Sequence, residues 1–271
     1  TTLLDGNWGY GQVAAMAAVD AGIEKCRAAG TAVTGAYHIN HVGRLGDFTE
    51  RCAKAGLIAF SFVGGTPPGA KGNVAPFGGR GPVWGTNPLA IAIPTGGEDV
   101  FSLDFATSVI AAGKAIAAKG KGEELEADYL IDAQGAPSRN PTDLLDRGGS
   151  ILPFGDHKGY GLAFVVELLA GALVGSLAPE LGEREMHNGL LLIVIDPEAI
   201  GSAGGFAASV ESVIERVKAC PPAEGFAEVM VPGEPERRRL AESRESGIPV
   251  AAAVVADLNR LGEELGVKLS W

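Results

Sequence analysis

A long stretch rich in glycine, proline and asparagine, lying between apolar segments, limits what this chain can fold into. Residues 64–88 read GGTPPGAKGNVAPFGGRGPVWGTNP, and neither a helix nor a regular strand can persist through so many breakers. A loop of this length is uncommon in a compact domain unless it has a function. Because binding residues concentrate on loops that a rigid scaffold holds, we expect part of a site here; the alternative is an irregular surface loop.

The segments around this loop alternate between helical and strand patterns. Apolar residues at helical spacing predict a helix over 11–29 that stops at Gly30, and the β-branched run 31–37 predicts the strand that follows. This alternation favours an α/β layer architecture, and neither an internal repeat nor a linker divides residues 1–271. The same patterns predict further strands over 57–63, 89–94, 100–105 and 189–196, and helices over 44–56, 109–119, 159–175, 206–219, 234–246 and 250–265.

Charge and cysteine content restrict the partners and the compartment that we expect. The net charge of −11, from 33 acidic and 22 basic residues, argues against nucleic acid and against an anionic membrane surface, since both need a basic face. No apolar run is long enough to span a membrane, and the first residues do not resemble a secretory leader. Cys26, Cys52 and Cys220 are isolated, so we expect buried thiols in the cytoplasm.

Two histidines follow the predicted strand 31–37, in the sequence YHINHVG. His38 and His41 could form half of a metal site, but no HExxH pattern or cysteine and aspartate cluster accompanies them, so we expect no metal. His41 lies at a strand-to-helix junction, where a side chain is held beside a cleft. Histidine exchanges protons near neutrality, its ordinary pKa being about 6.5, so we predict an acid/base role for His41.

Three further junctions offer groups that can hold phosphate, carboxylate or ribose. DFATS (104–108) ends a strand before a predicted helix, so Thr107 or Ser108 is the expected N-cap of a helix opening that can cradle phosphate. In PFGDHKGYG, His157 and Lys158 lie at a helix entrance, where a lysine can pair with a phosphate or carboxylate. VPGEPE places Glu234 in a turn before a helix, where a carboxylate can favour the helix dipole or bind ribose hydroxyls.

In their order along the chain these segments resemble the malate/L-lactate dehydrogenase family, which binds NAD(P) without a Rossmann motif. The resemblance is carried by INHVGRLGDF, VAPFGGRGPVWGTNPLAIAIP, LDFATS, PFGDHKGYGL and VPGEPE, and it runs from about Asp5 to the C-terminus. The wording HVGRLGDF is most similar to the broad-specificity hydroxycarboxylate dehydrogenase branch. In agreement with a family that lacks the Rossmann motif, no GxGxxG follows a predicted strand, and the P-loop and GxSxG patterns are absent from the sequence.

The resemblance implies an α/β fold with a mixed sheet, like that of L-sulfolactate and malate dehydrogenases and unlike the Rossmann fold, in a homodimer. It implies an oxidoreductase that transfers a hydride between NAD or NADP and C2 of a small 2-oxo or 2-hydroxy carboxylic acid. His41 is the implied acid/base residue. Because the substrate carboxylate needs a cation or hydrogen-bond donors, Lys158 and then Arg80 are the loop cations expected to hold an anionic group, Arg80 being the candidate for the substrate. The implied cofactor contacts are Gly46, Asp47, Phe48, Asp104, Phe105, Ala106, Thr107, Ser108, His157, Lys158, Asn188, Pro232, Gly233 and Glu234.

Two departures from the family pattern are visible. Gly64 and Gly65 stand where many relatives have Asn and Ser or Thr, so two side-chain donors to the cofactor are expected to be missing. Nothing matches the family's helical N-terminal region with its Ser-His-Gly motif, so we expect residues 1–271 to be one catalytic unit, truncated at its N-terminus relative to the family. Three alternatives stay open: a cyclic-imine carboxylate reductase of the same family, a remnant that binds nucleotide without turnover, and a metal-dependent hydrolase that uses the HxxH pair.

Overall fold

The computed structural model describes residues 1–67, 69–177, 187–201 and 203–269. The chain forms two compact units, Thr1–Val229 and Met230–Trp271. The second unit contains the helices α7 (Glu234–Ser246) and α8 (Ala252–Leu265). That residues 1–271 act as a single catalytic unit stays a prediction.

The first unit is built around a mixed sheet. Its strands are β1 (Thr2–Asp5), β2 (Thr31–Ile39), β3 (Ile58–Gly64), β4 (Leu89–Pro94), β5 (Val100–Phe105) and β9 (Asn188–Ile195), and a smaller sheet holds β6 (Leu130–Ile131), β7 (Pro137–Ser138) and β8 (Ser150–Ile151). The main sheet has six strands in the order β1-β2-β9-β3-β4-β5, and the small one has the order β7-β6-β8. In the main sheet β1 and β2 are parallel, whereas the other neighbouring pairs are antiparallel, so the predicted mixed sheet is confirmed.

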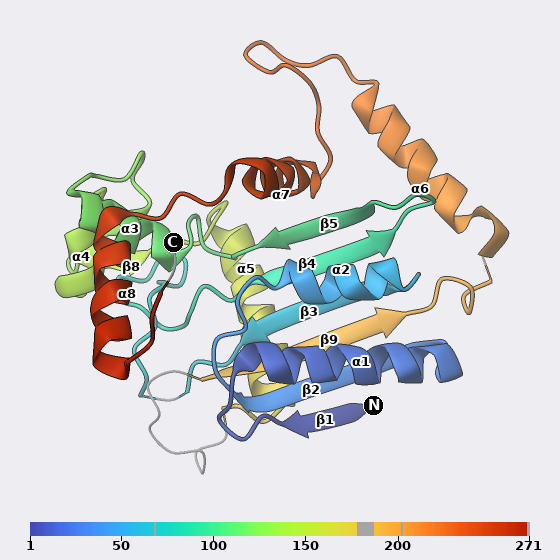
Figure 1. Cartoon of the computed structure of the whole chain (residues 1–271), viewed down its shortest axis with the longest axis horizontal. Helices are drawn as coiled ribbons and strands as arrows, with labels where there is room; N and C mark the ends of the chain where they lie inside the picture. The colour runs from blue at the N-terminus through green and yellow to red at the C-terminus, as the bar shows by residue number, and fades with distance from the viewer. Residues whose placement is uncertain (68, 178–186, 202, 270–271) are drawn as a thin grey trace. The chain divides into compact units, whose positions relative to one another are not determined.

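Helices cover both faces of the main sheet. The helices of this unit are α1 (Gly11–Ala29), α2 (Gly46–Lys54), α3 (Ala112–Lys121), α4 (Pro141–Asp146), α5 (His157–Val166), the π-helix η1 (Glu167–Leu173) and α6 (Ala203–Lys218). In Figure 1, α1 and α2 lie in front of the sheet and α5 lies behind it. The front helices contact β2 and β9 (α1) and β3, β4 and β5 (α2), while η1 contacts β3 and β9. The predicted α/β layers are confirmed.

Small side chains let α1 lie close to the sheet. The helix buries Ala15, Ala18 and Val19, and a Cβ added at Gly22 would meet Val194 Cγ2 at 3.1 Å. Covered on both faces, β9 reads as an almost continuous apolar run, as a doubly buried strand must. A core of this kind suits a chain with only 6% aromatic residues.

The predicted start of the helix 109–119 is wrong, and the hydrogen bonds of its expected N-cap residues explain why. α3 begins at Ala112 with Ala111 as its N-cap, so neither Thr107 nor Ser108 caps it. The hydroxyl of Thr107 instead donates to the carbonyls of Thr86 and Asn87, at 3.0 and 3.1 Å, and that of Ser108 donates to its own loop.

Two other features differ from expectation or add to it. The apolar stretch predicted as one helix over 159–175 is α5 followed by the π-helix η1, a wider turn that often occurs at functional sites. Cys26 and Cys52 are buried as expected, but Cys220 is exposed. Within the described ranges, no helix combines the length and apolar character needed to cross a membrane.

Candidate active site

One edge of the main sheet gathers the ends of five strands. Because β9 runs antiparallel to both β2 and β3, its first residues lie beside their last ones: Asn188 pairs with Ile39, and Gly189 pairs with Gly64. At the same edge Leu89, the first residue of β4, pairs with Phe105, the last residue of β5. The segments that leave or enter these strands, namely 40–46, 64–67, 85–88, 105–108 and 187–188, therefore meet at this edge.

A cavity of about 210 Å³ opens where these segments meet. His41 lines it from the β2 end, and His187 and Asn188 line it from the β9 end. Most of the remaining lining belongs to the glycine- and proline-rich loop 64–88, including Thr66, Lys71, Asn73 and Asn87. The loop that the sequence marked as a candidate site thus forms the wall of a cavity.

His41 is exposed at this cavity, and its ring has a defined orientation. Its Nδ1 accepts a hydrogen bond from the backbone N–H of Gly43 at 2.9 Å, so the hydrogen of the neutral ring resides on Nε2. The start of α1 supports the same loop: a Cβ at Gly11 would lie 2.1 Å from the carbonyl oxygen of Asn40 and 2.6 Å from that of His41. Only glycine lets the helix begin this close to the loop.

The carboxylate of Glu167 fastens the cavity wall to the helix behind the sheet. It accepts hydrogen bonds from the backbone N–H groups of Gly65 and Thr66, at 3.1 and 2.6 Å, and from Asn87 Nδ2 at 2.9 Å. Asn87 is buried, has a positive φ of 40°, and also donates to the carbonyl of Ala163. Sequence reasoning missed Glu167; its signal is a single carboxylate in the apolar run AFVVELLAGAL.

The glycines at the end of β3 have a steric reason. Gly65 has a φ of +96°, and a Cβ there would lie 2.2 Å from Ser176 Oγ. Gly189, which pairs with Gly64 on the neighbouring strand, is as tightly enclosed, since a Cβ there would lie 1.8 Å from the carbonyl oxygen of Ala170. Glycine is required at position 65 because η1 and the residues after it approach the strand ends closely. The missing side-chain donor is a consequence of this packing.

Two residues that line the cavity each have one buried polar atom without a partner among the described residues. His187 is only 5% exposed, and its Nε2 donates to the carbonyl of Ser176 at 2.8 Å, but its Nδ1 has no partner. Asn73 Oδ1 is in the same situation. Neither residue was singled out from the sequence.

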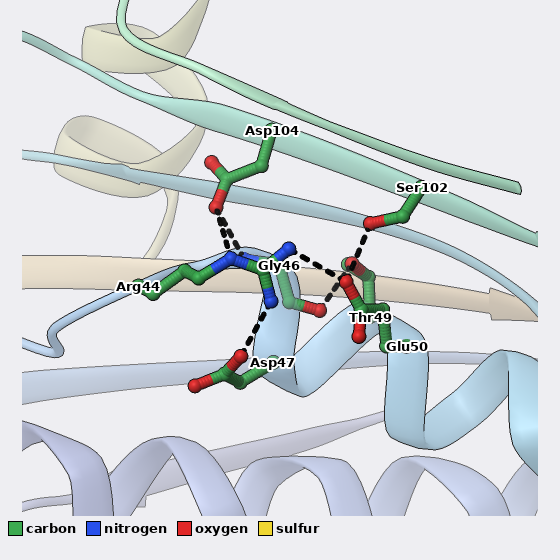
Figure 2. Close-up of polar contacts among 7 residues, drawn as sticks. All are labelled: Arg44, Gly46, Asp47, Thr49, Glu50, Ser102 and Asp104. Carbon is green, nitrogen blue, oxygen red and sulfur yellow. Dashed lines mark hydrogen bonds and ion pairs between the residues drawn. The ribbon is translucent and has the colours of Figure 1, made fainter. Parts of the chain in front are cut away.

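Beside the cavity, Arg44 holds three carboxylates in one network (Figure 2). Its guanidinium binds Asp47 Oδ1 at 2.5 Å and Glu50 Oε1 at 2.7 Å, and its Nε lies 4.0 Å from Asp104 Oδ2. Asp104 Oδ2 also accepts the backbone N–H of Gly46 at 2.7 Å, at the start of α2, and Ser102 Oγ donates to Glu50 at 2.7 Å. This network ties the loop that carries His41 to β5.

Burial and pairing act differently on the carboxylates of this network. Burial raises the pKa of Asp104, and the Gly46 N–H and Arg44 offset it only in part. Burial also tends to raise the pKa of Glu50, but hydrogen bonds from Arg44 and Ser102 outweigh it, so that pKa is lowered. Despite its own partial burial, Arg44 has a raised pKa because Glu50 and Asp47 stabilise its charge.

Three predicted cofactor residues therefore have structural partners already. Gly46, Asp47 and Asp104 belong to the Arg44 network, and Phe48 lies in the hydrophobic core between α1, α2 and the sheet. Their contact with a cofactor stays a prediction.

The structure brings 104–108 and 153–158 together next to the cavity. Phe154 N donates to the carbonyl of Thr107 at 3.0 Å, and the ring of Phe105 meets that of Phe154 edge-on at 5.4 Å. Thr107 in turn bonds Thr86 and Asn87, which line the cavity. Ala106 is half-buried in this segment.

His157 and Lys158 begin α5 and are exposed, as the sequence predicted, after Asp156 with its positive φ of 56°. Neither residue lines the cavity. Arg80 is also exposed and lies outside it, beside Gly135, whereas Lys71 does line the cavity. Lys71 is the one lysine or arginine among the described lining residues, and sequence reasoning overlooked it.

The last predicted contacts lie in the second unit. Gly233, with a φ of +95°, is the N-cap of α7, and Glu234 Oε2 accepts the backbone N–H of Val231 at 3.1 Å, as expected of a carboxylate in a first helical turn. Pro232, which directly precedes Gly233, is exposed. Contact of these residues with the adenosine end of a cofactor stays a prediction.

In the part of the chain that the structure describes, no group of three or more histidine, cysteine, aspartate or glutamate residues is arranged to hold a metal ion. The other histidine of the HxxH pair, His38, bonds Asp5 Oδ1 through its Nδ1 at 2.8 Å, and its ring lies tilted against that of Trp8, with centroids 4.5 Å apart.

Comparison with known proteins gives consistent matches along the chain. The family model described as malate/L-lactate dehydrogenase matches residues 1–259. The chain is 33% identical to the malate/(S)-sulfolactate dehydrogenase of Methanothermus fervidus (99% of this chain, 77% of the relative). It is 38% identical to the hydroxycarboxylate dehydrogenase B of Escherichia coli O157:H7 (92% and 69%).

Two further matches widen the comparison. The chain is 36% identical to the Δ1-pyrroline-2-carboxylate/Δ1-piperideine-2-carboxylate reductase of Pseudomonas syringae (95% of this chain, 73% of the relative). Among solved structures, the sulfolactate dehydrogenase of Methanocaldococcus jannaschii matches with a TM-score of 0.83 and 33% identity, over 99% of this chain and 77% of that one.

Proposed function

Because the chain belongs to the malate/L-lactate dehydrogenase family, we propose that it transfers a hydride between NAD(P)H and C2 of a 2-oxo or 2-hydroxy carboxylic acid. It is an oxidoreductase of hydroxy acids, with the mixed-sheet fold of the sulfolactate and malate dehydrogenases. The observation that carries the proposal is that His41, whose Nδ1 is held by the Gly43 N–H, lines a cavity at the sheet edge where five strand ends meet.

The residues of this cavity fit the reactive end of a nicotinamide cofactor. A volume of about 210 Å³ is below the roughly 300–1,000 Å³ of pockets for drug-sized ligands, so it takes a ring and a small acid, not a whole dinucleotide. The unpartnered His187 Nδ1 and Asn73 Oδ1 are buried acceptors that a polar ligand would satisfy. The residues proposed to hold the remainder are 104–108, His157 and Lys158, beside the cavity. When bound, the cofactor supplies or accepts the hydride.

His41 is proposed to exchange the proton at the C2 oxygen. A neutral ring that gave up its Nε2 hydrogen would be left as an imidazolate, so the donor must be the imidazolium. In that form Nδ1 carries a hydrogen and can no longer accept from Gly43, so proton delivery is coupled to release of this hydrogen bond. Protonation thus frees the ring from its resting contact as it prepares the acid.

The substrate carboxylate needs a cation or hydrogen-bond donors. Lys71, exposed on the cavity wall, is better placed for this than Arg80, which lies outside the cavity. We therefore propose that Lys71 takes the role expected of Arg80. Use of NAD or NADP, assembly as a homodimer and a cytoplasmic location follow from the sequence resemblance and the isolated cysteines, and remain proposals.

A second candidate function is reduction of a cyclic imine carboxylate. The 36% identity to the Pseudomonas syringae reductase favours keeping it. A protonated His41 and Lys71 could serve this substrate as well, because it too pairs a carboxylate with a carbon that accepts hydride.

The decisive experiment is a cofactor titration followed by a substrate panel. We expect NADH or NADPH to show a fluorescence change on binding, and 2-oxo acids to be reduced. Reduction of cyclic imines alone would select the second candidate, whereas binding without turnover would identify a remnant that has kept only the nucleotide site.

A further inference from the structure

A second imidazole, that of His187, lines the cavity, and neither the proposed proton transfer nor the binding of the substrate carboxylate uses it. His187 immediately precedes β9, so it lies at the same sheet edge as His41, which follows β2. Its ring is 5% exposed and meets the ring of Trp8 edge-on at 5.4 Å. A histidine packed this closely has a fixed orientation.

The partner of one ring nitrogen determines what the other can do. Nε2 lies 2.8 Å from the carbonyl oxygen of Ser176, and because a carbonyl only accepts, Nε2 carries a hydrogen. In the neutral ring Nδ1 is then a lone-pair acceptor. It is buried, and no described residue donates to it. An unsatisfied buried acceptor costs about 1–3 kcal/mol, so a native structure keeps one where something else satisfies it.

A second residue that lines this cavity, Asn73, also has a buried acceptor without a hydrogen-bond donor among the described residues. This acceptor is its Oδ1, and the residue belongs to the loop 64–88. Two acceptors without donors, on two residues that line one cavity, are what a bound group with hydrogens of its own would satisfy.

We propose that His187 Nδ1 accepts a hydrogen bond from an N–H or O–H group of the molecule bound in this cavity. The inference rests on the proposed function, which supplies two sources of such a hydrogen: the carboxamide of a nicotinamide ring and the hydroxyl of a 2-hydroxy acid. A carboxylate has no hydrogen to donate, so it belongs at Lys71 and not at His187.

Two variants separate the anchoring nitrogen from the accepting one. The amide nitrogen of glutamine lies as many bonds from Cα as the histidine Nε2, so His187→Gln keeps a donor for Ser176 and removes the acceptor at Nδ1. The side-chain oxygen of asparagine lies as many bonds from Cα as Nδ1, so His187→Asn keeps an acceptor and loses the donor. Thermal unfolding shows that each variant is folded.

The ligand side uses probes that lack the hydrogen. We compare NADH and NADPH with their reduced 3-acetylpyridine analogues, which have a methyl group in place of the amide NH₂. We also compare a 2-hydroxy acid with the same acid lacking its 2-hydroxyl, in the presence of oxidised cofactor. Dissociation constants from fluorescence titration are the readout.

If the carboxamide is the donor, the unaltered chain binds NAD(P)H about tenfold more tightly than the analogue, one hydrogen bond being worth about that factor. This preference disappears in His187→Gln and persists in His187→Asn. If the hydroxyl is the donor, the cofactor preference is the same in all chains, and His187→Gln instead loses a tenfold preference for the hydroxylated acid. Either result supports the inference.

A folded His187→Gln chain that binds all of these ligands as the unaltered chain does would overturn the inference alone. Absence of NAD(P)H binding by the unaltered chain would overturn the proposed function as well, so the two failures are distinguishable.

Discussion

Replacing Gly65 by alanine tests the packing that forms the cavity wall. The residue has a φ of +96°, and an L-residue in the left-handed region costs about 1–2 kcal/mol. The added Cβ would also lie 2.2 Å from Ser176 Oγ, and overpacking of this kind costs about 1–3 kcal/mol. We therefore expect Gly65→Ala to lower the free energy of unfolding by about 2–5 kcal/mol, measured by urea denaturation.

A matched control separates the two costs. Gly78 has a φ of +81° and no atom within 4 Å of its added Cβ, so Gly78→Ala should show the conformational cost alone, about 1–2 kcal/mol. Adding Ser176→Ala to Gly65→Ala removes the obstructing oxygen and should recover part of the difference. Equal costs for Gly65→Ala and Gly78→Ala, with no recovery in the double variant, would refute the steric argument.

Three further predictions concern the site. His41→Ala should lower turnover by about 10²–10⁴-fold, the range for a general acid, with little change in the NAD(P)H dissociation constant. The control is His38→Ala, outside the cavity, which should change turnover and the dissociation constant little. Parallel loss of turnover and cofactor affinity in His41→Ala would remove the acid/base assignment. Glu167→Gln places an amide N–H against backbone donors, so it should lower the free energy of unfolding by about 1–3 kcal/mol and weaken cofactor binding. Urea denaturation measures the first effect and fluorescence titration the second. Unchanged values of both would exclude a role of Glu167 in holding the cavity wall. Because burial raises the pKa of Asp104 in the folded chain, that chain binds more protons there, and the contribution of Asp104 to the free energy of unfolding should fall as the pH rises from 3.8 through the raised pKa. Lowered carboxylate pKa values such as that of Glu50 act in the opposite direction, so the test is the difference in unfolding free energy between the unaltered chain and Asp104→Asn, measured by urea denaturation at a series of pH values. A difference that does not change with pH would contradict the prediction.

Local patterns predicted most elements because their periodicity is set by which faces are buried. The helix 11–29 and the strand 100–105 occur with the predicted boundaries, since each has a clear period and a clear stop. The start of α3 could not be predicted in this way. Thr107 is a good N-cap by type, but its hydroxyl is used by carbonyls of residues 86 and 87, far away in the sequence.

Local patterns predicted the site in two places: at the residues that follow a strand end, and in the glycine- and proline-rich loop 64–88, which lines most of the cavity. The strand-end pattern found His41, and it is confirmed as a residue of the β2–α2 junction at a cavity. His187 has the reverse position, just before a strand, and it reaches the same edge only because β9 inserts antiparallel between β2 and β3. Glu167 and Lys71 likewise depend on tertiary contacts that no local pattern encodes.

The account is tested most directly by following the hydride itself. The chain is incubated with NAD(P)H carrying deuterium at C4 of the nicotinamide ring and with a 2-oxo acid, and the product is analysed by mass spectrometry and proton NMR. The account predicts a 2-hydroxy acid with one deuterium bound to C2. Two cofactor samples are used, one labelled on each face of C4, because the hydride leaves from one face only. A 2-hydroxy acid without deuterium at C2 from both samples would contradict the account. So would a folded chain that binds the cofactor but reduces no 2-oxo acid and no cyclic imine.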